Sequence, residues 1–420
     1  MFHFCGQGHA GSRPASDGAL RAGGDGETLA QMPPMVFLRA AIEARVLGAP
    51  ISDDAALALG DTDELVPAML EGACAIRDRA FGRTLTYSPK VFLPITNLCR
   101  NRCDYCSFRR SPGDAGEWTM TPAEIDDVLA RGRSEGCAEA LLCLGDKPET
   151  AFSAYRRTLA TLGQASTVDY LVWASERAIA HGLVAHTNAG ILASGEMARL
   201  AETNASLGLM LETASERLCA PGMPHHRAPD KRPKRRLAMI AEAGALAIPF
   251  TTGILLGIGE TRREQVEALL AIRALAEKHG HIQEVIVQSF RTRPGIVMEH
   301  APEPTDAETA RVIALARLVL DDAITVQAPP NLHKDTTATL IGAGINDFGG
   351  ISPVTPDYVN HRHPWPHLDR LGEACAALGF RLAPRLPVHA GWVGREGFLR
   401  DRARAAVSAI AARLEGGAAA

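Results

Sequence analysis

The pattern of hydrophobic residues along the chain changes near residue 87. Before that point, apolar positions between residues 36 and 83 recur at helical spacing, and Ser52 or Asp53 is suited to cap a helix. After it, short apolar runs without polar alternation each end in polar residues or glycine. We expect strands at 91–96, 140–145, 183–187, 207–212, 248–257, 282–290, 324–328 and 344–348, with helices between them, for example at 122–135, 195–204, 263–279 and 306–320.

Repeated alternation of buried strands and helices predicts a parallel sheet that is covered on its outside. The simplest closure is an α/β (β/α)8 TIM-like barrel, and a doubly wound open sheet is an alternative that periodicity does not separate from it. In a barrel, chemistry gathers at the carboxyl ends of the strands. The expected organisation is a flexible extension at 1–34, a helical collar at 35–86, the barrel with a C-terminal helical segment at 87–400, and a helix with a loose tail at 401–420.

Composition narrows the class of protein. The 420 residues include 44 Lys and Arg against 48 Asp and Glu, so a polybasic nucleic-acid binder is excluded, and 46% hydrophobic residues allow a large core. The longest uncharged stretch, 243–259, is shorter than the roughly 20 residues of a membrane span. The beginning lacks the pattern of a signal peptide, and nine cysteines are few and odd in number. We therefore expect a cytoplasmic protein that binds neither membrane nor nucleic acid.

Three cysteines follow the first expected strand with the spacing C-x3-C-x2-C, namely Cys99, Cys103 and Cys106. Three thiolates on one loop can hold a 4Fe-4S cluster and leave the fourth iron open, because a closed cluster takes four cysteines. An open iron can bind S-adenosylmethionine, whose sulfonium yields a 5'-deoxyadenosyl radical when it receives an electron. A zinc site is the alternative, but the nearest downstream histidine is His181, and the usual four-ligand spacing is missing.

This cysteine loop resembles the signature of the radical S-adenosylmethionine superfamily. Further segments resemble one family within it, the CofG-type subunit of 7,8-didemethyl-8-hydroxy-5-deazariboflavin (FO) synthase, and together they span the chain from about residue 87 to 365. The first 34 residues have no counterpart in the pattern of this family. The resembling segments are 98–108, 143–149, 186–188, 210–213, 249–260, 283–290, 327–332 and 346–353.

The resemblance implies a radical carbon–nitrogen lyase of deazaflavin coenzyme biosynthesis. Such an enzyme closes an adduct of a p-hydroxybenzyl group and a ribitylaminouracil to FO, with release of ammonia, 5'-deoxyadenosine and methionine. The hypothesis for its chemistry is hydrogen abstraction from the benzylic methylene. A CofH-type radical enzyme would supply the adduct, and a ferredoxin or flavodoxin would supply the electron. Because the chain holds one cluster motif, it is similar to the ring-closing half alone.

Seven residues are expected to bind S-adenosylmethionine beside the cluster. Gly145 and Asp146 follow the second strand, where backbone carbonyls and an acid would hold the methionine amino group, although a plain strand-end turn would look the same. Glu212 ends an apolar run and is expected near the ribose hydroxyls. Arg236 matches the arginine that meets the methionine carboxylate, although the basic run 231–236 also suits a solvated helix start. The other three are Tyr105, Gly257 and Glu260, the last two in a glycine-rich segment expected around the adenine.

Polar residues at or just beyond strand ends are candidates for hydrogen-bonding the carbonyl and hydroxyl groups of the substrate. Each of them alone is as well suited to capping a loop. A sister radical enzyme, such as one of the futalosine route to menaquinone, would share the barrel and cluster, and a non-catalytic metal-binding scaffold would share only the cysteines. The candidate substrate residues are Lys147, Asn188, Gln288, Gln327, Asn331, Asn346 and Asp347.

Overall fold

A computed structural model describes residues 33–333 and 337–417. The expected flexible extension at 1–34 lies, apart from its last two residues, outside this range. The chain then forms three helices in the region predicted as a helical collar, and Ser52 caps the second of them by accepting a hydrogen bond from the amide of Ala55 at 3.2 Å. These helices are α1 (Pro34–Val46), α2 (Asp53–Asp61) and α3 (Val66–Phe81).

Eight parallel strands form a closed barrel. Each strand pairs with its neighbour in chain order, and β1 pairs with both β8 and β2, which closes the sheet on itself and rules out the open-sheet alternative. Every predicted apolar run overlaps one of these strands. They are β1 (Thr84–Pro94), β2 (Glu139–Cys143), β3 (Val184–Asn188), β4 (Asn204–Gly208), β5 (Phe250–Leu256), β6 (Ile282–Ser289), β7 (Thr325–Gln327) and β8 (Asp347–Ile351).

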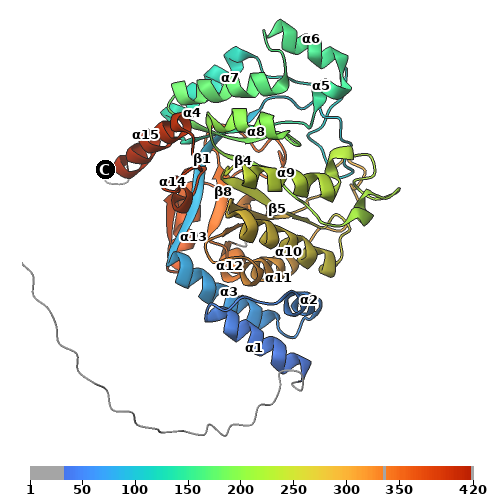
Figure 1. The fold of residues 1–420 in the computed structure, drawn as a ribbon, viewed down its shortest axis with the longest axis vertical. Helices are drawn as coiled ribbons and strands as arrows, with labels where there is room; N and C mark the ends of the chain where they lie inside the picture. Colours follow the sequence, from blue (N-terminus) through green and yellow to red (C-terminus); the bar gives the residue numbers. More distant parts are fainter. Residues whose placement is uncertain (1–32, 334–336, 418–420) are drawn as a thin grey trace, which may run out of the picture.

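Helices cover the outside of the barrel (Figure 1). Capping boxes begin three of them, with Thr121, Thr261 and Thr305 each accepting from the amide of a glutamate three residues later. The covering helices are α4 (Pro122–Ser134), α7 (Thr167–Ala180), α8 (Ser194–Ala201), α9 (Pro233–Ala245), α10 (Arg262–His279), α11 (Asp306–Val319) and α12 (Thr337–Gly342), with the short helices α5 (Pro148–Ala151) and α6 (Ser153–Thr161) between β2 and α7. None of the helices in the described ranges is long and apolar enough to cross a membrane.

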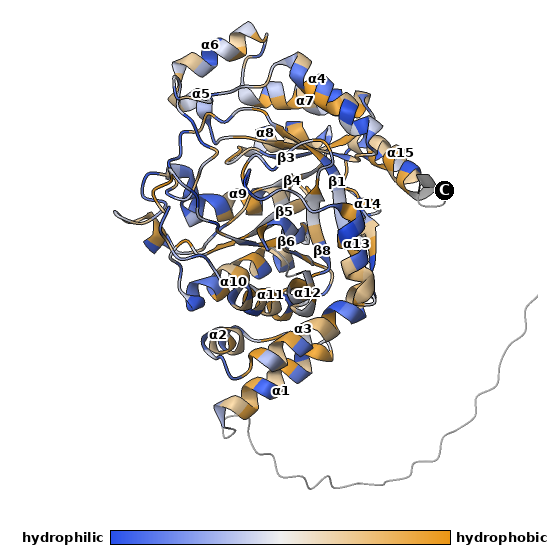
Figure 2. Ribbon diagram, turned by 180° about the vertical axis from the view of Figure 1, so that it is seen from behind, coloured by the Kyte–Doolittle hydropathy of each residue, from blue (hydrophilic) through white to orange (hydrophobic). Residues whose placement is uncertain are grey.

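The collar packs against one side of the barrel's helical layer. Helix α3 contacts α11, and α2 contacts α10. As a result α11 lies between the barrel and the collar, and its residues 309–319 are all buried. Hydrophobic residues cover much of α1 and α3 in Figure 2, as expected for helices that bury apolar surface against the barrel layer.

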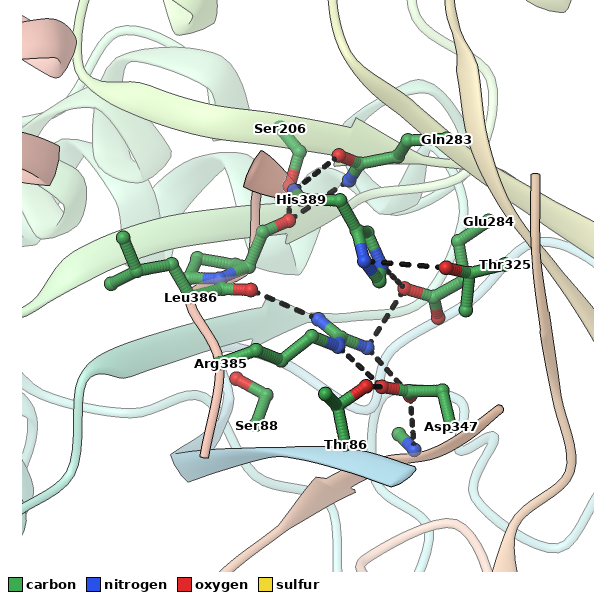
Figure 3. A network of polar contacts seen from close by, with 12 residues as sticks. Thr86, Ser88, Ser206, Gln283, Glu284, Thr325, Asp347, Arg385, Leu386 and His389 are labelled. Atoms are coloured by element: carbon green, nitrogen blue, oxygen red, sulfur yellow. Dashed lines mark hydrogen bonds and ion pairs between the residues drawn. The ribbon is translucent and has the colours of Figure 1, made fainter. Parts of the chain in front are cut away.

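A C-terminal segment closes the amino-terminal end of the barrel. Strand β9 (Arg381–Pro384), which the hydrophobic pattern did not predict, pairs with the first residues of β1. Arg385 then forms ion pairs with Glu284 at 2.8 Å and Asp347 at 2.6 Å, and His389 contacts Glu284 at 3.0 Å (Figure 3). This network forms the barrel floor. Helices α13 (Leu368–Ala377), α14 (Ala390–Val393) and α15 (Asp401–Gly417) flank it in sequence.

The eighth strand begins three residues later than the sequence indicated. Gly344 adopts a positive φ of 100°, and a Cβ there would lie 2.9 Å from the Cβ of Ala73, so this glycine belongs to a turn. Asn346 and Asp347 consequently lie at the amino end of β8, in or next to the floor. Asn346 accepts a hydrogen bond from Arg317 at 2.6 Å. The structure therefore places both residues at the opposite end of the strand from the one expected for substrate contacts.

Candidate active site

The three cysteines of the predicted cluster motif line one cavity of about 250 Å³ at the carboxyl ends of the strands. Cys99 lies just after β1, and its Sγ accepts a hydrogen bond from the amide of Asp146 at 3.1 Å. The amide of Cys106 donates to the carbonyl of Cys103 at 3.1 Å, which folds the loop into a tight turn. All three thiols are free of disulfide bonds. We call this space the upper cavity.

Gly145 allows the cysteine loop to pack against the end of β2. A Cβ at Gly145 would lie 2.0 Å from the carbonyl oxygen of Leu98 and 2.6 Å from the Cβ of Cys99. The Gly145 amide also donates to the carbonyl of Thr96 at 3.1 Å. The sequence suggested that Gly145 lets a ligand approach the backbone closely. In the structure, it is the chain's own cysteine loop that approaches Gly145.

The donor set suits an iron–sulfur cluster. Burial raises the pKa of Cys99 to about 12 and raises that of Cys103 as well, so a bound metal would be needed to keep these thiols deprotonated. No three His, Cys, Asp or Glu side chains in the described ranges are grouped around a point that a single ion could occupy. A cubane cluster does not require this, because each cysteine binds a different iron atom.

Glu212 is a buried, ionised carboxylate in the wall of the upper cavity. Tyr105 donates its hydroxyl to Glu212 at 2.6 Å, Lys231 forms an ion pair with it, and the Nε2 of His225 lies 3.3 Å away. Burial alone would raise the pKa of this carboxyl, but Lys231, His225 and Arg236 outweigh it and hold the pKa well below its usual range. Glu212 also adopts a φ of 66°, a left-handed conformation that is uncommon for non-glycine residues.

The same wall presents an acid and a guanidinium. Asp146 accepts hydrogen bonds from the amide of Ile191 at 3.1 Å and from Asn101 at 3.2 Å, and burial and the nearby Asp230 raise its pKa. Arg236 donates from Nε to the carbonyl of Met210 at 2.6 Å and from Nη1 to that of Asp230 at 3.1 Å. Its Nη2 makes no hydrogen bond within the described part of the chain. Together these groups are suited to the amino and carboxylate groups of an amino acid.

Two predicted cofactor residues stand back from this wall. Glu260 accepts hydrogen bonds from the amides of Gly257 and Ile258, both at 2.9 Å, and so closes the turn after β5. Neither Gly257 nor Glu260 lines the upper cavity, whereas Leu255 does. Their expected contact with the adenine remains a prediction.

The candidate substrate residues divide between the cavity and the surrounding structure. Asn188 and Gln288 line the upper cavity. Lys147 instead pairs with Glu196 at 2.8 Å, and Asn331 donates to Asp357 at 2.9 Å. Gln327 lines a second, deeper cavity of about 120 Å³, which we call the lower cavity.

The structure adds two features that sequence reasoning missed. Cys143, at the end of β2, lines the upper cavity beside the cysteine loop, although it had been given no role. In addition, a surface hollow of about 530 Å³ adjoins Cys103 and Cys106, and we call it the arginine mouth. Its arginines come from four separate loops. The sequence therefore contains no single run of positive charge from which this hollow could be predicted. They are Arg102, Arg109, Arg110, Arg227, Arg293 and Arg362.

Comparisons with known proteins identify relatives of this chain. The family model of the radical SAM superfamily matches residues 93–272. The 7,8-didemethyl-8-hydroxy-5-deazariboflavin synthase of Methanopyrus kandleri is 46% identical over 312 residues, which are 74% of this chain and 93% of that protein. The FO synthase of Nocardia farcinica is 43% identical over 353 residues, 81% of this chain but only 41% of that longer protein.

Solved structures show the same fold at low sequence identity. The hydrogenase maturase HydG is similar with a TM-score of 0.72 and 16% identity, covering 89% of this chain and 80% of that one. Methylornithine synthase (PylB) is similar with a TM-score of 0.63 and 17% identity, covering 82% and 97%. These two likenesses support the closed barrel.

Proposed function

This chain belongs to the FO synthase family within the radical SAM superfamily, and from that premise we propose that it performs the ring-closing half of FO synthesis. The observation that carries the proposal is the shared wall of the upper cavity, where the three cysteines of the loop meet Asp146, Glu212 and Arg236. A relative covered over 93% of its own length, rather than over a single motif, supports the choice of this family over a sister radical enzyme.

The residues of this wall are suited to holding a 4Fe-4S cluster and S-adenosylmethionine. When bound, this pair supplies one-electron cleavage of the sulfonium and thereby hydrogen abstraction from substrate. Cys99, Cys103 and Cys106 would ligate the cluster. The free Nη2 of Arg236 would meet the methionine carboxylate, and Asp146 would lie near the amino group.

Tyr105 and Glu212 would position the ribose. Because Lys231 keeps Glu212 ionised, this carboxylate can accept hydrogen bonds from vicinal hydroxyls, and the Tyr105 hydroxyl fixes its orientation. Asn188 and Gln288, which line the same cavity, would hold the substrate's carbonyl and amine groups. The benzylic methylene of the adduct is the carbon we expect to lose hydrogen.

Two protein partners follow from this proposal. The Nocardia farcinica relative is more than twice as long as its matched part, which is consistent with a second enzymatic half that supplies the adduct. Here a separate CofH-type enzyme would do so. The electron would come from a small acidic redox protein, because the arginine mouth adjoins Cys103 and Cys106 and carries six arginines.

The decisive experiment is anaerobic reconstitution with iron and sulfide, followed by dithionite, S-adenosylmethionine and adduct deuterated at the benzylic methylene. We expect the FO absorbance to appear and deuterium to be found in 5'-deoxyadenosine. Cys103→Ser should abolish both, whereas Cys219→Ser, which changes a half-buried cysteine away from the upper cavity, should abolish neither. Formation of 5'-deoxyadenosine without deuterium or FO would contradict the proposed reaction.

A further inference from the structure

The lower cavity lies between the upper cavity and the barrel floor. Asn188 and Met210 line both cavities, so the two adjoin each other, and Glu284 and Arg385 belong to both the lower cavity and the floor. Its volume of about 120 Å³ compares with the ~10–15 Å³ that one water needs. The lower cavity can therefore hold a short, flexible chain.

Three polar side chains of the lower cavity are buried without a partner in the described part of the chain. Lys90, Thr251 and Gln327 are 8%, 8% and 6% exposed, and their side chains make no hydrogen bond or ion pair with another described residue. The ammonium of Lys90 instead faces aromatic rings, at 5.0 Å from the centroid of Trp365. Because these polar groups line the lower cavity without a hydrogen-bond partner in the described part of the chain, they are available to bind a ligand there.

Two glycines of β8, which pairs with the strands that carry Lys90 and Gln327, leave room for these side chains. A Cβ at Gly350 would lie 2.2 Å from the Cδ of Lys90, and one at Gly349 would lie 2.0 Å from the Nε2 of Gln327. Both glycines are in β8, where any larger residue would push the two polar side chains aside. The strand is thus built to keep these groups in place.

The charges that line the lower cavity balance. Lys90 and Arg385 face Glu139 and Glu284, and the pKa of Glu284 is lowered to about 2, where Arg385 and His389 overcome the effect of burial. Burial also lowers the pKa of His186, which keeps its imidazole neutral. The lining therefore has no net charge and offers both hydrogen-bond donors and acceptors, which suits an uncharged ligand.

We propose that the lower cavity binds a neutral polyol, the ribityl chain of the substrate, and rejects a chain that ends in phosphate. Each hydroxyl can both donate and accept, which matches a lining that mixes amide, ammonium, hydroxyl and carboxylate groups. A terminal phosphate would bring its charge close to Glu139 and Glu284. This assignment rests on the proposed function, which names the substrate, and adds where its side chain lies.

Calorimetry on the reconstituted protein tests the assignment, with three ligands that share the aminouracil ring and carry a ribityl, an ethyl or a phosphoribityl chain. The parent protein should bind the ribityl compound at least tenfold more tightly than either of the others. Thr251→Val and Gln327→Met should each weaken ribityl binding roughly three- to tenfold, because each removes a hydrogen bond. Neither should change ethyl binding.

Thr252→Val is the matched control. Its hydroxyl donates to the carbonyl of Leu209 at 2.8 Å and accepts from the amide of Leu211 at 3.2 Å. Because Thr252 does not line the lower cavity, this variant loses buried hydrogen bonds but should keep the parent's preference for ribityl over ethyl. Equal affinity for the three compounds in the parent, or equal losses for ribityl and ethyl in the variants, would show that the lower cavity holds only water. FO formation by the parent would persist in that case, whereas failure of the proposed function would remove FO formation itself.

Discussion

At the scale of single residues, Gly145 shows how one missing methyl group permits the cysteine loop to pack. We expect Gly145→Ala to displace Leu98 and Cys99, because the new Cβ would overlap a carbonyl oxygen that cannot move independently of the loop. Iron content and 5'-deoxyadenosine formation should both fall at least tenfold. Gly195→Ala, where a Cβ meets nothing within 4 Å, is the control and should retain both. Full iron loading in Gly145→Ala would refute this reading.

A second residue-scale prediction concerns acid stability. His281 is fully buried, its Nε2 donates to the carbonyl of Ile240 at 2.8 Å, and its Nδ1 has no hydrogen-bond partner among the described residues. Burial lowers its pKa from 6.5 to about 4, so on acidification the unfolded chain takes up a proton before the folded chain does. The free energy of unfolding should fall as the pH drops from 6.5 toward 4, by up to about 3 kcal/mol.

Urea unfolding at a series of pH values from 7 to 5 measures this slope. His281→Gln keeps a donor for Ile240 but does not titrate, so the loss of stability over this range should be smaller in the variant than in the parent. Identical slopes would assign the acid sensitivity to other groups.

The spacing of the cysteines in the sequence was enough to predict that they share one loop. The positions of the other site residues depend on contacts between distant parts of the chain. Cys99, Cys103 and Cys106 lie on one loop, so their common cavity follows from the sequence itself. Lys147 follows Gly145 and Asp146 directly, yet it turns away to Glu196, a residue that only the folded chain brings near. Asp347 was misplaced because Gly349 and Gly350 resemble a strand end, whereas in the structure they lie within β8 and leave space for Lys90 and Gln327.

At the scale of elements, the segment after β9 stabilises the barrel from below. Arg385→Met would leave Glu284 and Asp347 buried without their main partner, which typically costs about 3–5 kcal/mol. We expect a clear fall in melting temperature, measured by circular dichroism. Arg381→Met, which changes an exposed residue of β9, should leave the melting temperature unchanged. Equal melting temperatures for the two variants would mean that the floor does not depend on Arg385.

The difference between the predicted and the missed strands has a physical cause. The eight barrel strands are buried among helices and so appear as apolar runs. Strand β9 is short, and two of its four residues are exposed, so its hydrophobic signal is too weak to detect. Its position depends on pairing with β1, which lies almost 300 residues earlier in the chain.

At the scale of the whole molecule, the arginine mouth gathers positive charge beside Cys103 and Cys106, two of the cysteines that we propose hold the cluster. Arg102 and Arg362 are exposed parts of the arginine mouth, and we expect the double variant Arg102→Glu, Arg362→Glu to raise the KM for flavodoxin roughly tenfold. Activity driven by dithionite should stay at the parent level, because dithionite needs no protein docking surface. The flavodoxin-dependent rate of the parent should also fall with added salt. An unchanged KM would place the docking surface elsewhere.

The closed floor also constrains the order of events in catalysis. A molecule bound in the lower cavity must pass Asn188 and Met210, which lie beside the position proposed for S-adenosylmethionine. With S-adenosylmethionine at the position we propose, we expect a molecule at the bottom of the barrel to enter first and leave last. Because the barrel is closed at its amino-terminal end, 5'-deoxyadenosine and methionine would have to leave before FO can leave.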